Sequence, residues 1–326
     1  MQPKLPPLKD VIAKHGLFTR KSLGQHFLLD TSITDKIALY AGDMKNHNVI
    51  EIGSGPGGLT RSLLNSGAKT LTVVEKDDRC IAIVEELQQV YGSDKLHIMH
   101  EDALKVNLIE AVAAPRKIVA NLPYNVGTMM LLHWLEDIYK QMNISTVMPD
   151  ADFPHEFTSG LGKSSDVASS TKERLDTSLR WHDKENSAYS SLTLMFQEEV
   201  AQRIIAAPDT SEYGRLAVIC QFLCECRYDF QLPPEAFSPP PKVHSAVITL
   251  TPRAKPLFPV SKPALEKVVA AAFGQRRKML RSALRQLGVP IEPLLEQAGI
   301  DGTLRAEVLT IEEFCKLTQA YESGKI

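Results

Sequence analysis

The sequence predicts an α/β protein in which helices cover a mostly parallel sheet, followed by a small all-α domain. Short apolar, β-branched runs alternate with helical stretches, which is typical of βαβ units and a parallel sheet. From Pro263 onward the pattern is helical, with Gly288 and Pro290 as its break. A Pro-containing segment separates the two parts, so we expect domains of 1–255 and 256–326.

The α/β part begins with a predicted amphipathic helix at 31–41. The next elements are expected in NVIEIGSGPGGLTRSLL (strand, glycine turn, helix), TLTVVEKD (strand), 79–90 (helix), KLHIMHEDAL and KIVANLPY (strands), and SLTLMFQEEVAQRIIA (strand, helix). Residues 145–190 break this rhythm, because they are Ser-rich and show no sustained period. We expect an insertion or long loop there, with a short helix around 171–180.

The segment 216–230 is predicted to be a buried strand that pairs antiparallel with the strand in VHSAVITLTP. Cys220, Cys224 and Cys226 have even spacing, which places them on one face of that strand as small hydrophobic residues. A metal site is the alternative, but no His-x-His and no second Cys pair lies near them. The five cysteines are odd in number and scattered, which argues against a disulfide framework.

Composition and charge restrict the classes of function. The sequence has no run of 18 apolar residues, which excludes a membrane-spanning helix. Its first residues, MQPKLPPLKD, contain no apolar signal segment, so we expect a cytoplasmic protein, with a monomer as the default. Lys and Arg number 37 against 39 Asp and Glu, so binding to nucleic acid would need a local basic patch.

A glycine-rich loop follows the first strand of the sheet, where glycine lets the backbone approach a ligand closely. Gly53, Gly55 and Gly58 satisfy the GxGxxG pattern, and Glu75 ends the next strand, 17 residues after Gly58. An acid at that place bonds ribose hydroxyls in dinucleotide-binding folds, so a nicotinamide dinucleotide is one ligand that fits. A tight turn without a ligand is the alternative, although a single glycine would suffice for it.

Two residues of this region favour a cationic ligand without phosphate. Pro56 lacks the N–H that a pyrophosphate would need. Glu51 precedes the first glycine, close to where a ligand would lie, and an acid there suits a positive charge. S-adenosylmethionine is a ligand of this class.

The fourth strand ends in Asn121-Leu122-Pro123-Tyr124, at the same edge of the sheet as the glycine loop. The exocyclic amino group of adenine is a poor nucleophile, because its lone pair is delocalised into the ring. The Asn121 side-chain oxygen and the Leu122 carbonyl can accept its hydrogens and free that lone pair. Pro123 would fix the turn and Tyr124 would stack on the flipped base, a surface Pro turn being the alternative. Asp102, after the third strand, can bond an adenine amino group or cap the next helix.

A basic stretch lies in the helical part of the chain. Residues 267–291 contain no acid and six bases, namely Lys267, Arg276, Arg277, Lys278, Arg281 and Arg285. We predict one helix in which Arg277, Arg281 and Arg285 form a single stripe at i, i+4 and i+8. Such a stripe suits phosphate contacts with RNA or DNA, and a solvated helix face is the alternative.

Seven blocks in order resemble the ribosomal RNA adenine dimethyltransferase family: KSLGQHFLLD, EIGSGPGGLT, NLPY, FQEEVAQRI, EYGRL, PPEAFSPPPKVHSAV and AAFGQRRKMLRSAL. The resemblance covers about residues 14–320. It implies a class I, Rossmann-like methyltransferase fold with a small helical C-terminal domain, and S-adenosylmethionine as methyl donor. The implied substrate is two adjacent adenosines near the 3′ end of small-subunit rRNA, each converted to N6,N6-dimethyladenosine in the immature subunit.

By position, the resemblance implies cofactor contacts from His26, Leu28, Gly53, Glu75, Asp102 and Asn121. The predicted catalytic residues are Asn121, Leu122 and Tyr124, and the predicted RNA contacts are Arg276, Arg277, Lys278, Arg281 and Arg285. The family usually has Asn where His26 stands, so that contact is altered or runs through the backbone, with a structural histidine as the alternative. Residues 145–190 are atypical of the family.

These features predict direct in-line methyl transfer to N6, in which the protein supplies orientation and acceptors but no metal and no carboxylate base. Two alternatives belong to other classes. A non-catalytic ribosome-assembly or nucleic-acid-binding factor on the same fold is disfavoured by the intact glycine loop and NLPY. A nicotinamide-dependent oxidoreductase is disfavoured by NLPY and Pro56.

Overall fold

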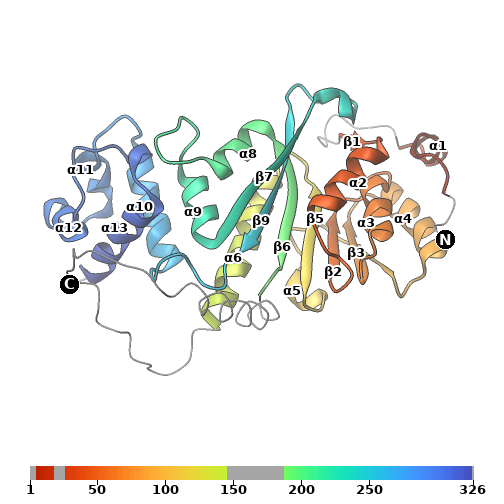
Figure 1. Cartoon of the computed structure of the whole chain (residues 1–326), viewed down its shortest axis with the longest axis horizontal. Coiled ribbons are helices and arrows are strands. Elements are labelled where there is room, and N and C mark those ends of the chain that lie inside the picture. Colours follow the sequence, from red (N-terminus) through yellow and green to blue (C-terminus); the bar gives the residue numbers. More distant parts are fainter. Residues whose placement is uncertain (1–4, 18–25, 145–186, 325–326) are drawn as a thin grey trace, which may run out of the picture.

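The computed structural model describes residues 5–17, 26–144 and 187–324, which are organised around a seven-stranded sheet (Figure 1). In spatial order its strands are β4 (Leu96–His100), β3 (Thr70–Glu75), β2 (Asn48–Ile52), β5 (Arg116–Asn121), β6 (Ser191–Gln197), β9 (Ser245–Pro252) and β7 (Cys224–Leu232). Strands β2 to β6 pair in parallel, whereas β9 lies antiparallel to both β6 and β7. The α/β class, the mostly parallel sheet and the late antiparallel pair are confirmed.

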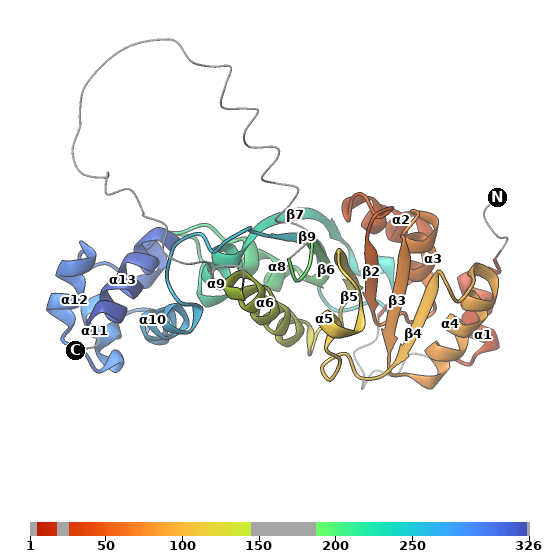
Figure 2. The ribbon, with the colours of Figure 1, turned by 90° about the horizontal axis from the view of Figure 1, so that it is seen from below.

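Helices cover both faces of the sheet (Figure 2). One face carries α2 (Thr31–Tyr40), α3 (Gly58–Asn65) and α4 (Asp78–Tyr91); the other carries α5 (Leu108–Ala111), α6 (Gly127–Ile144), α8 (Glu198–Ile205) and α9 (Arg215–Leu223). Strand side chains alternate between the two layers: in β2, Val49 packs with the first group, and Ile50 and Ile52 pack with the second. A further short helix, α1 (Leu8–Lys14), had no counterpart in the prediction.

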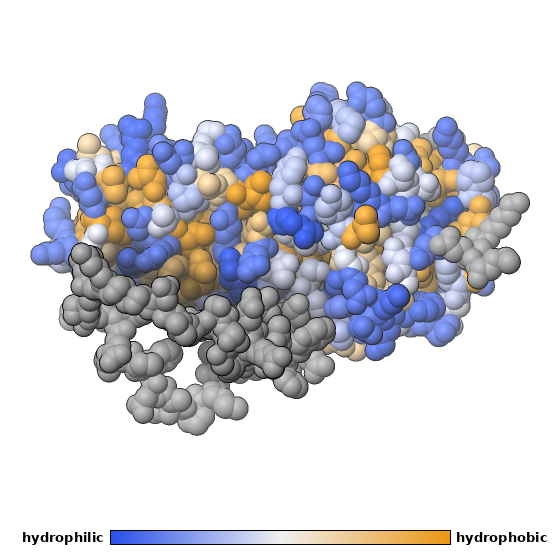
Figure 3. All heavy atoms as spheres, in the orientation of Figure 1, coloured by the Kyte–Doolittle hydropathy of each residue, from blue (hydrophilic) through white to orange (hydrophobic). Residues whose placement is uncertain are grey.

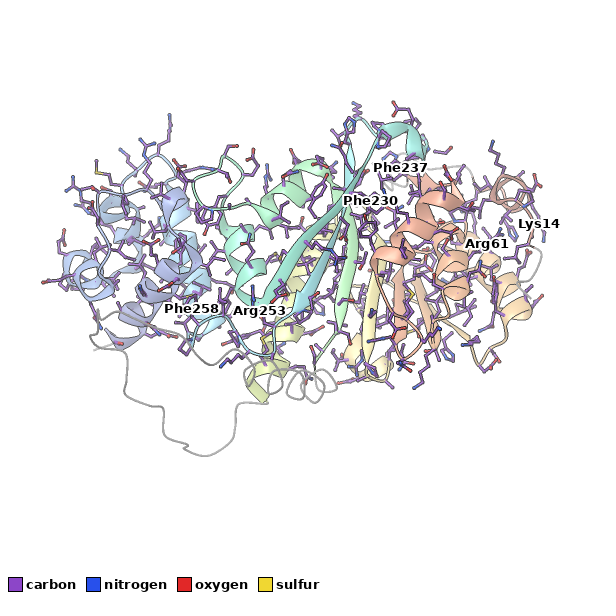
Figure 4. The ribbon with its side chains drawn as sticks, in the orientation of Figure 1. Lys14, Arg61, Phe230, Phe237, Arg253 and Phe258 are labelled. Carbon is purple, nitrogen blue, oxygen red and sulfur yellow. The ribbon has the colours of Figure 1, made fainter. Side chains whose placement is uncertain are left out.

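The strand order places two loops beside each other. From β2 the chain moves outward to β3 and β4, and β5 then returns to the opposite side of β2. Ligands of open α/β sheets bind where the order reverses in this way, at the carboxyl ends of the strands. A two-stranded sheet of β1 (Phe27–Leu28) and β8 (Phe237–Ser238) brings the N-terminal segment to the same region. Phe230 and Phe237 pack with the helices of this half of the molecule, beside α2 (Figure 4).

The prediction of one buried strand over 216–230 is wrong in its first half. Residues up to Leu223 form the helix α9, and β7 begins at Cys224. This segment is apolar at almost every position because it is buried on all sides, and such a run has no period that separates helix from strand. Cys220 and Cys224 are buried and free, as expected of small hydrophobic residues, but they do not share a strand face.

The last part of the described chain is helical, as predicted. It contains α10 (Lys262–Gly274), α11 (Leu280–Ala283), α12 (Ile291–Ala298) and α13 (Ile311–Ser323), with short 3-10 turns between them. The connection to it follows the end of α9, since the Arg253 guanidinium donates to the Gln221 carbonyl and Phe258 packs on the core (Figure 4). One apolar core continues from β6 through α9 into α10 and α13. We propose 1–255 and 256–326 as the two domains.

The prediction that Arg277, Arg281 and Arg285 share one helix is wrong. Helix α10 ends at Gly274, and a turn closed by the Lys278 N–H on the Gln275 carbonyl precedes α11. Arg277 therefore lies in the turn, Arg281 lies in α11, and Arg285 lies in a 3-10 turn. Two features end the helix: glycine is a poor helix former, and the next turn is held by bonds from Arg276 to the loop before α9.

The predicted insertion at 145–190, with its helix at 171–180, lies outside the described residues except for 187–190. Within the described ranges, no helix has the length and apolar character needed to span a membrane.

Candidate active site

A cavity of about 560 Å³ lies at the carboxyl ends of β2, β3 and β5, a size typical of small-molecule sites. Its lining includes every residue that the sequence predicts for cofactor binding and catalysis, namely His26, Leu28, Gly53, Glu75, Asp102, Asn121, Leu122 and Tyr124. These residues come from loops that are far apart in the sequence, and the strand order brings them together.

The glycine loop forms one wall of the cavity. Gly53, Gly55 and Gly57 have φ values of 74°, 52° and 82°, a region in which the backbone of residues other than glycine is strained. A Cβ on Gly55 would lie 3.0 Å from the Phe27 ring, and one on Gly58 would lie 3.0 Å from the Leu28 carbonyl. The loop therefore needs its glycines both for its shape and for its close packing against β1.

Glu75 is held rigidly at the end of β3. Its Oε1 accepts from the backbone N–H groups of Lys76 and Asp77, at 2.8 and 2.9 Å. Its Oε2 lies 3.4 Å from both the Gly55 nitrogen and the Ser54 hydroxyl. The carboxylate is thus oriented by its own turn, with one oxygen directed toward the glycine loop.

Glu51 is a buried carboxyl group in the cavity wall. Burial raises its pKa to about 8, and the negative charge of Glu75 adds to that shift. The hydroxyl and N–H of Thr60 oppose the shift, but neither carboxyl oxygen has a hydrogen bond of ordinary geometry. A buried acid without a partner is costly to ionise, and a positive ligand in the cavity would relieve that cost.

This burial predicts a pH dependence of stability. Between the ordinary pKa of 4.5 and the folded value of about 8, the unfolded chain loses the Glu51 proton while the folded chain keeps it. The free energy of unfolding therefore falls as pH rises through that window. Glu51→Gln should remove this fall, which for the two pKa values amounts to about 4 kcal/mol between pH 5 and pH 9 in the ligand-free protein.

The measurement is denaturant unfolding of both proteins across that pH range, with Glu101→Gln as the control. Glu101 is an exposed acid of the same cavity, so its variant makes the same chemical change without removing a buried carboxyl group. Parallel pH profiles for Glu51→Gln and the wild type would show that the Glu51 carboxyl is solvated.

Asn121, the last residue of β5, has its amide fixed by a neighbouring chain segment. Its Nδ2 donates to the His26 carbonyl at 3.1 Å, which leaves Oδ1 as the acceptor end of the group. The Leu122 side chain is buried, and the Pro123 carbonyl accepts from the N–H groups of Val126 and Gly127, which closes the turn into α6. The tetrapeptide is therefore a rigid turn whose polar groups line the cavity.

Tyr124 and His26 form a stacked pair, with ring centroids 5.4 Å apart and an interplanar angle of 29°. The Tyr124 hydroxyl lies 2.5 Å from the Ser245 hydroxyl, and burial raises the pKa of the phenol, which therefore stays neutral. The His26 Nδ1 lies 2.8 Å from the Pro239 carbonyl. The roles of Pro239 and Ser245 were missed by the sequence reasoning, although both stand in the PPPKVHS block.

The cavity is acidic. Its lining contains six acids, Glu51, Glu75, Asp77, Asp78, Glu101 and Asp102, against the two bases Lys76 and Arg79. Asp102 accepts from the Leu104 N–H and lies 3.8 Å from the Lys76 ammonium group. Among the residues that the structure describes, no three His, Cys, Asp or Glu side chains are grouped to hold a metal ion.

The basic residues of the C-terminal part lie at the opposite end of the molecule from β3 and β4 (Figure 1). Arg277, Lys278, Arg281 and Arg285 are exposed, and hydrophilic side chains border apolar ones over α10 and α11 (Figure 3). Arg276 is exposed as well, but it also pairs with Glu307 at 3.3 Å and donates to the Ser211 and Tyr213 carbonyls. Arg276 therefore holds the turn after α10 to the loop before α9, and the basic surface lies apart from the cavity.

Comparison with known proteins identifies the family of this chain. The family model described as ribosomal RNA adenine dimethylase matches residues 17–323. The ribosomal RNA small subunit methyltransferase A of Jannaschia sp. (strain CCS1) is 46% identical over 318 residues, which cover 98% of this chain and 94% of that protein. The protein of the same name from Paramagnetospirillum magneticum is 46% identical over 319 residues, with 98% and 96% covered.

Solved structures agree on the fold. A dimethyladenosine transferase from Plasmodium falciparum has a TM-score of 0.66 at 22% identity, with 91% of this chain and 98% of that one covered. The 23S rRNA methyltransferase ErmE has a TM-score of 0.59 at 22% identity, with 91% and 99% covered. The fold is therefore the Rossmann-like methyltransferase fold. With the family model matched from residue 17 to residue 323 and close relatives over nearly its full length, the chain belongs to the ribosomal RNA adenine dimethylase family.

Proposed function

We propose that this protein transfers methyl groups from S-adenosylmethionine to the N6 atoms of two adjacent adenosines near the 3′ end of small-subunit rRNA, within the immature subunit. Family membership supports adenine methylation of rRNA, and relatives 43–46% identical are named for the small ribosomal subunit. The observation that carries the proposal is Asn121, a fixed amide acceptor beside Tyr124 at an acidic cavity.

The cavity suits S-adenosylmethionine. Glu51, which is buried without a hydrogen-bond partner, and the excess of acids favour a positive ligand. The glycine loop lets a ligand approach the backbone closely, because its residues carry no side chains. When bound, this cofactor supplies a methyl group on a positively charged sulfur. Glu75 would accept from the ribose hydroxyls and Asp102 from the adenine amino group. The other contacts would come from the backbone of His26 and from Leu28, Gly53 and Asn121.

The chemistry proposed for the protein is the orientation of the target amino group. The Asn121 Oδ1 and the Leu122 carbonyl accept the two N6 hydrogens, and Tyr124 stacks on the flipped base. Fixed acceptors of this kind act most strongly when positive charge develops on N6 during transfer. The proton on the methylated nitrogen is acidic at that stage, so this step needs no carboxylate base.

RNA binding would use phosphate contacts from the exposed Arg277, Lys278, Arg281 and Arg285. The segment between α10 and α12 that carries them lies at the far end of the molecule from β3 (Figure 1), so docking and chemistry would occupy separate surfaces. We further propose that the protein acts as a monomer in the cytoplasm, where its substrate would be assembled.

The proposed function is tested by methyl incorporation from labelled S-adenosylmethionine into immature small subunits, with naked rRNA as the comparison. Identification of the product nucleoside as N6,N6-dimethyladenosine at two adjacent positions is the expected result. Binding of subunits without methyl transfer would instead support a non-catalytic assembly factor on this fold.

Glu75→Gln is expected to weaken S-adenosylmethionine binding roughly 10- to 100-fold, because a charge-assisted bond to ribose is lost while the side-chain shape is kept. Calorimetric titration of the purified variant measures this effect. Asp78→Asn is the matched control, since Asp78 is an acid of the cavity rim paired with His100. An unchanged affinity for Glu75→Gln would place the ribose elsewhere.

A further inference from the structure

We infer that His26 is a positioning residue for the target adenine: its imidazole holds the Tyr124 ring and joins it to the loop before β9. The inference rests on the proposed function and extends it to a residue that the reaction itself does not need. Its basis is the stacked pair at 5.4 Å together with the bond between the His26 Nδ1 and the Pro239 carbonyl at 2.8 Å.

His26 is itself fixed on three sides. The residue after it, Phe27, pairs with Ser238 in the two-stranded sheet. The Pro239 carbonyl is purely an acceptor, so the bond to it assigns the proton to Nδ1 and sets the plane of the imidazole. The backbone carbonyl of His26 accepts from the Asn121 amide. The imidazole is therefore a rigid support rather than a mobile surface side chain.

Tyr124 depends on this support. Its hydroxyl is bonded to Ser245 at one edge of the ring, and this one bond does not by itself fix the tilt of the ring plane. Stacking by His26 removes the tilt and occupies one ring face, so that the other face remains for a base. Pro239 begins the loop after β8 and Ser245 begins β9, so the histidine and the tyrosine are anchored to the two ends of one short connection.

The two contacts of residue 26 with the tetrapeptide are separable. Asn121 is held by the backbone carbonyl, which every substitution retains, whereas Tyr124 is held by the side chain. Side-chain variants of His26 therefore change the base platform and leave the amide acceptor in place.

Two variants test the aromatic ring and the N–H donor of the imidazole separately. His26→Asn keeps an N–H donor near the position of Nδ1 and removes the ring, whereas His26→Phe keeps a ring and removes the donor. The assay is single-turnover methylation of immature subunits at saturating cofactor, with calorimetry of S-adenosylhomocysteine and thermal melting on each protein. We expect His26→Asn to slow methylation roughly 3- to 10-fold with unchanged cofactor affinity, and His26→Phe to recover most of that loss.

A double-mutant cycle with Tyr124→Leu completes the test. Once Tyr124 is absent, His26→Asn should have no further effect on the rate, because the support has nothing to hold. The inference is overturned if the two losses multiply, if His26→Phe is as slow as His26→Asn, or if cofactor affinity falls in parallel with the rate. If the wild type is active and His26→Asn methylates at the same rate, only the inference about His26 is overturned. If the wild type itself is inactive, the proposed function is overturned as well.

Discussion

Asn121→Ala is expected to lower the single-turnover rate of methylation by about 100-fold or more. The Asn121 amide is held by the His26 carbonyl, so its Oδ1 is in place before the base arrives. An acceptor fixed in advance stabilises the charge that develops on N6 without reorganisation during the reaction. Turnover should therefore fall far more than RNA binding, which would depend on phosphate contacts elsewhere.

The experiment compares methylation rates and RNA binding for the wild type, Asn121→Ala and Asn107→Ala. Asn107 is a matched asparagine outside the cavity, where it caps α5, so its loss should cost about 1 kcal/mol of stability and little activity. Some loss of cofactor affinity in Asn121→Ala is compatible with its position in the cavity. Near-normal methylation at saturating RNA and cofactor would make the tetrapeptide a structural turn and favour the non-catalytic factor.

Charge reversal of Arg277, Arg281 and Arg285 to Glu should weaken RNA binding by on the order of 100-fold or more at low salt. All three side chains are exposed, and each reversal replaces a possible phosphate contact by repulsion. The salt dependence of binding should flatten, because fewer counterions are released. Cofactor affinity should not change, since β2, β3 and β5, whose ends line the cavity, lie in the other half of the molecule (Figure 1).

The control reverses Lys140, Arg203 and Lys316, which are surface cations in i,i+4 ion pairs. This variant undergoes the same change in net charge, so it separates a local contact from a general electrostatic effect. Arg276 is left intact in both proteins because its bonds to Glu307 and to the loop before α9 support the fold. Equal RNA affinity for the wild type and the Arg277, Arg281, Arg285 variant would contradict the proposed surface.

Sequence reasoning succeeded where local chemistry decides the structure. The strand, glycine loop and helix around Gly53–Gly58 follow from a short apolar run, left-handed turn positions and an apolar helix face. The acid at the end of β3 and the tetrapeptide at the end of β5 could be placed at one edge, because carboxyl ends of parallel strands lie together.

Other features depended on neighbours that are distant in sequence. Residues 216–223 form a helix, but their apolar run has no helical period. Burial on all sides leaves almost no polar positions to mark such a period. The basic stretch is divided among α10, a turn, α11 and a 3-10 turn, and Arg276 is bound to a loop more than 60 residues earlier.

The sequence by itself therefore determined the α/β class and the family resemblance, because these depend on local pattern and motifs. The rule for parallel strands placed the glycine loop, Glu75, Asp102 and Asn121 at one edge of the sheet, whereas His26 and Leu28 followed only from the resemblance. Only the tertiary structure decided how those residues are held: Glu51 without a partner, the Asn121 amide on the His26 carbonyl, and the His26 ring on Tyr124. The last two contacts form only when β1, β5 and β8 come together in the fold. Asn121 and His26 are 95 residues apart and His26 and Pro239 are 213 residues apart, so no local pattern in the sequence predicts that they meet.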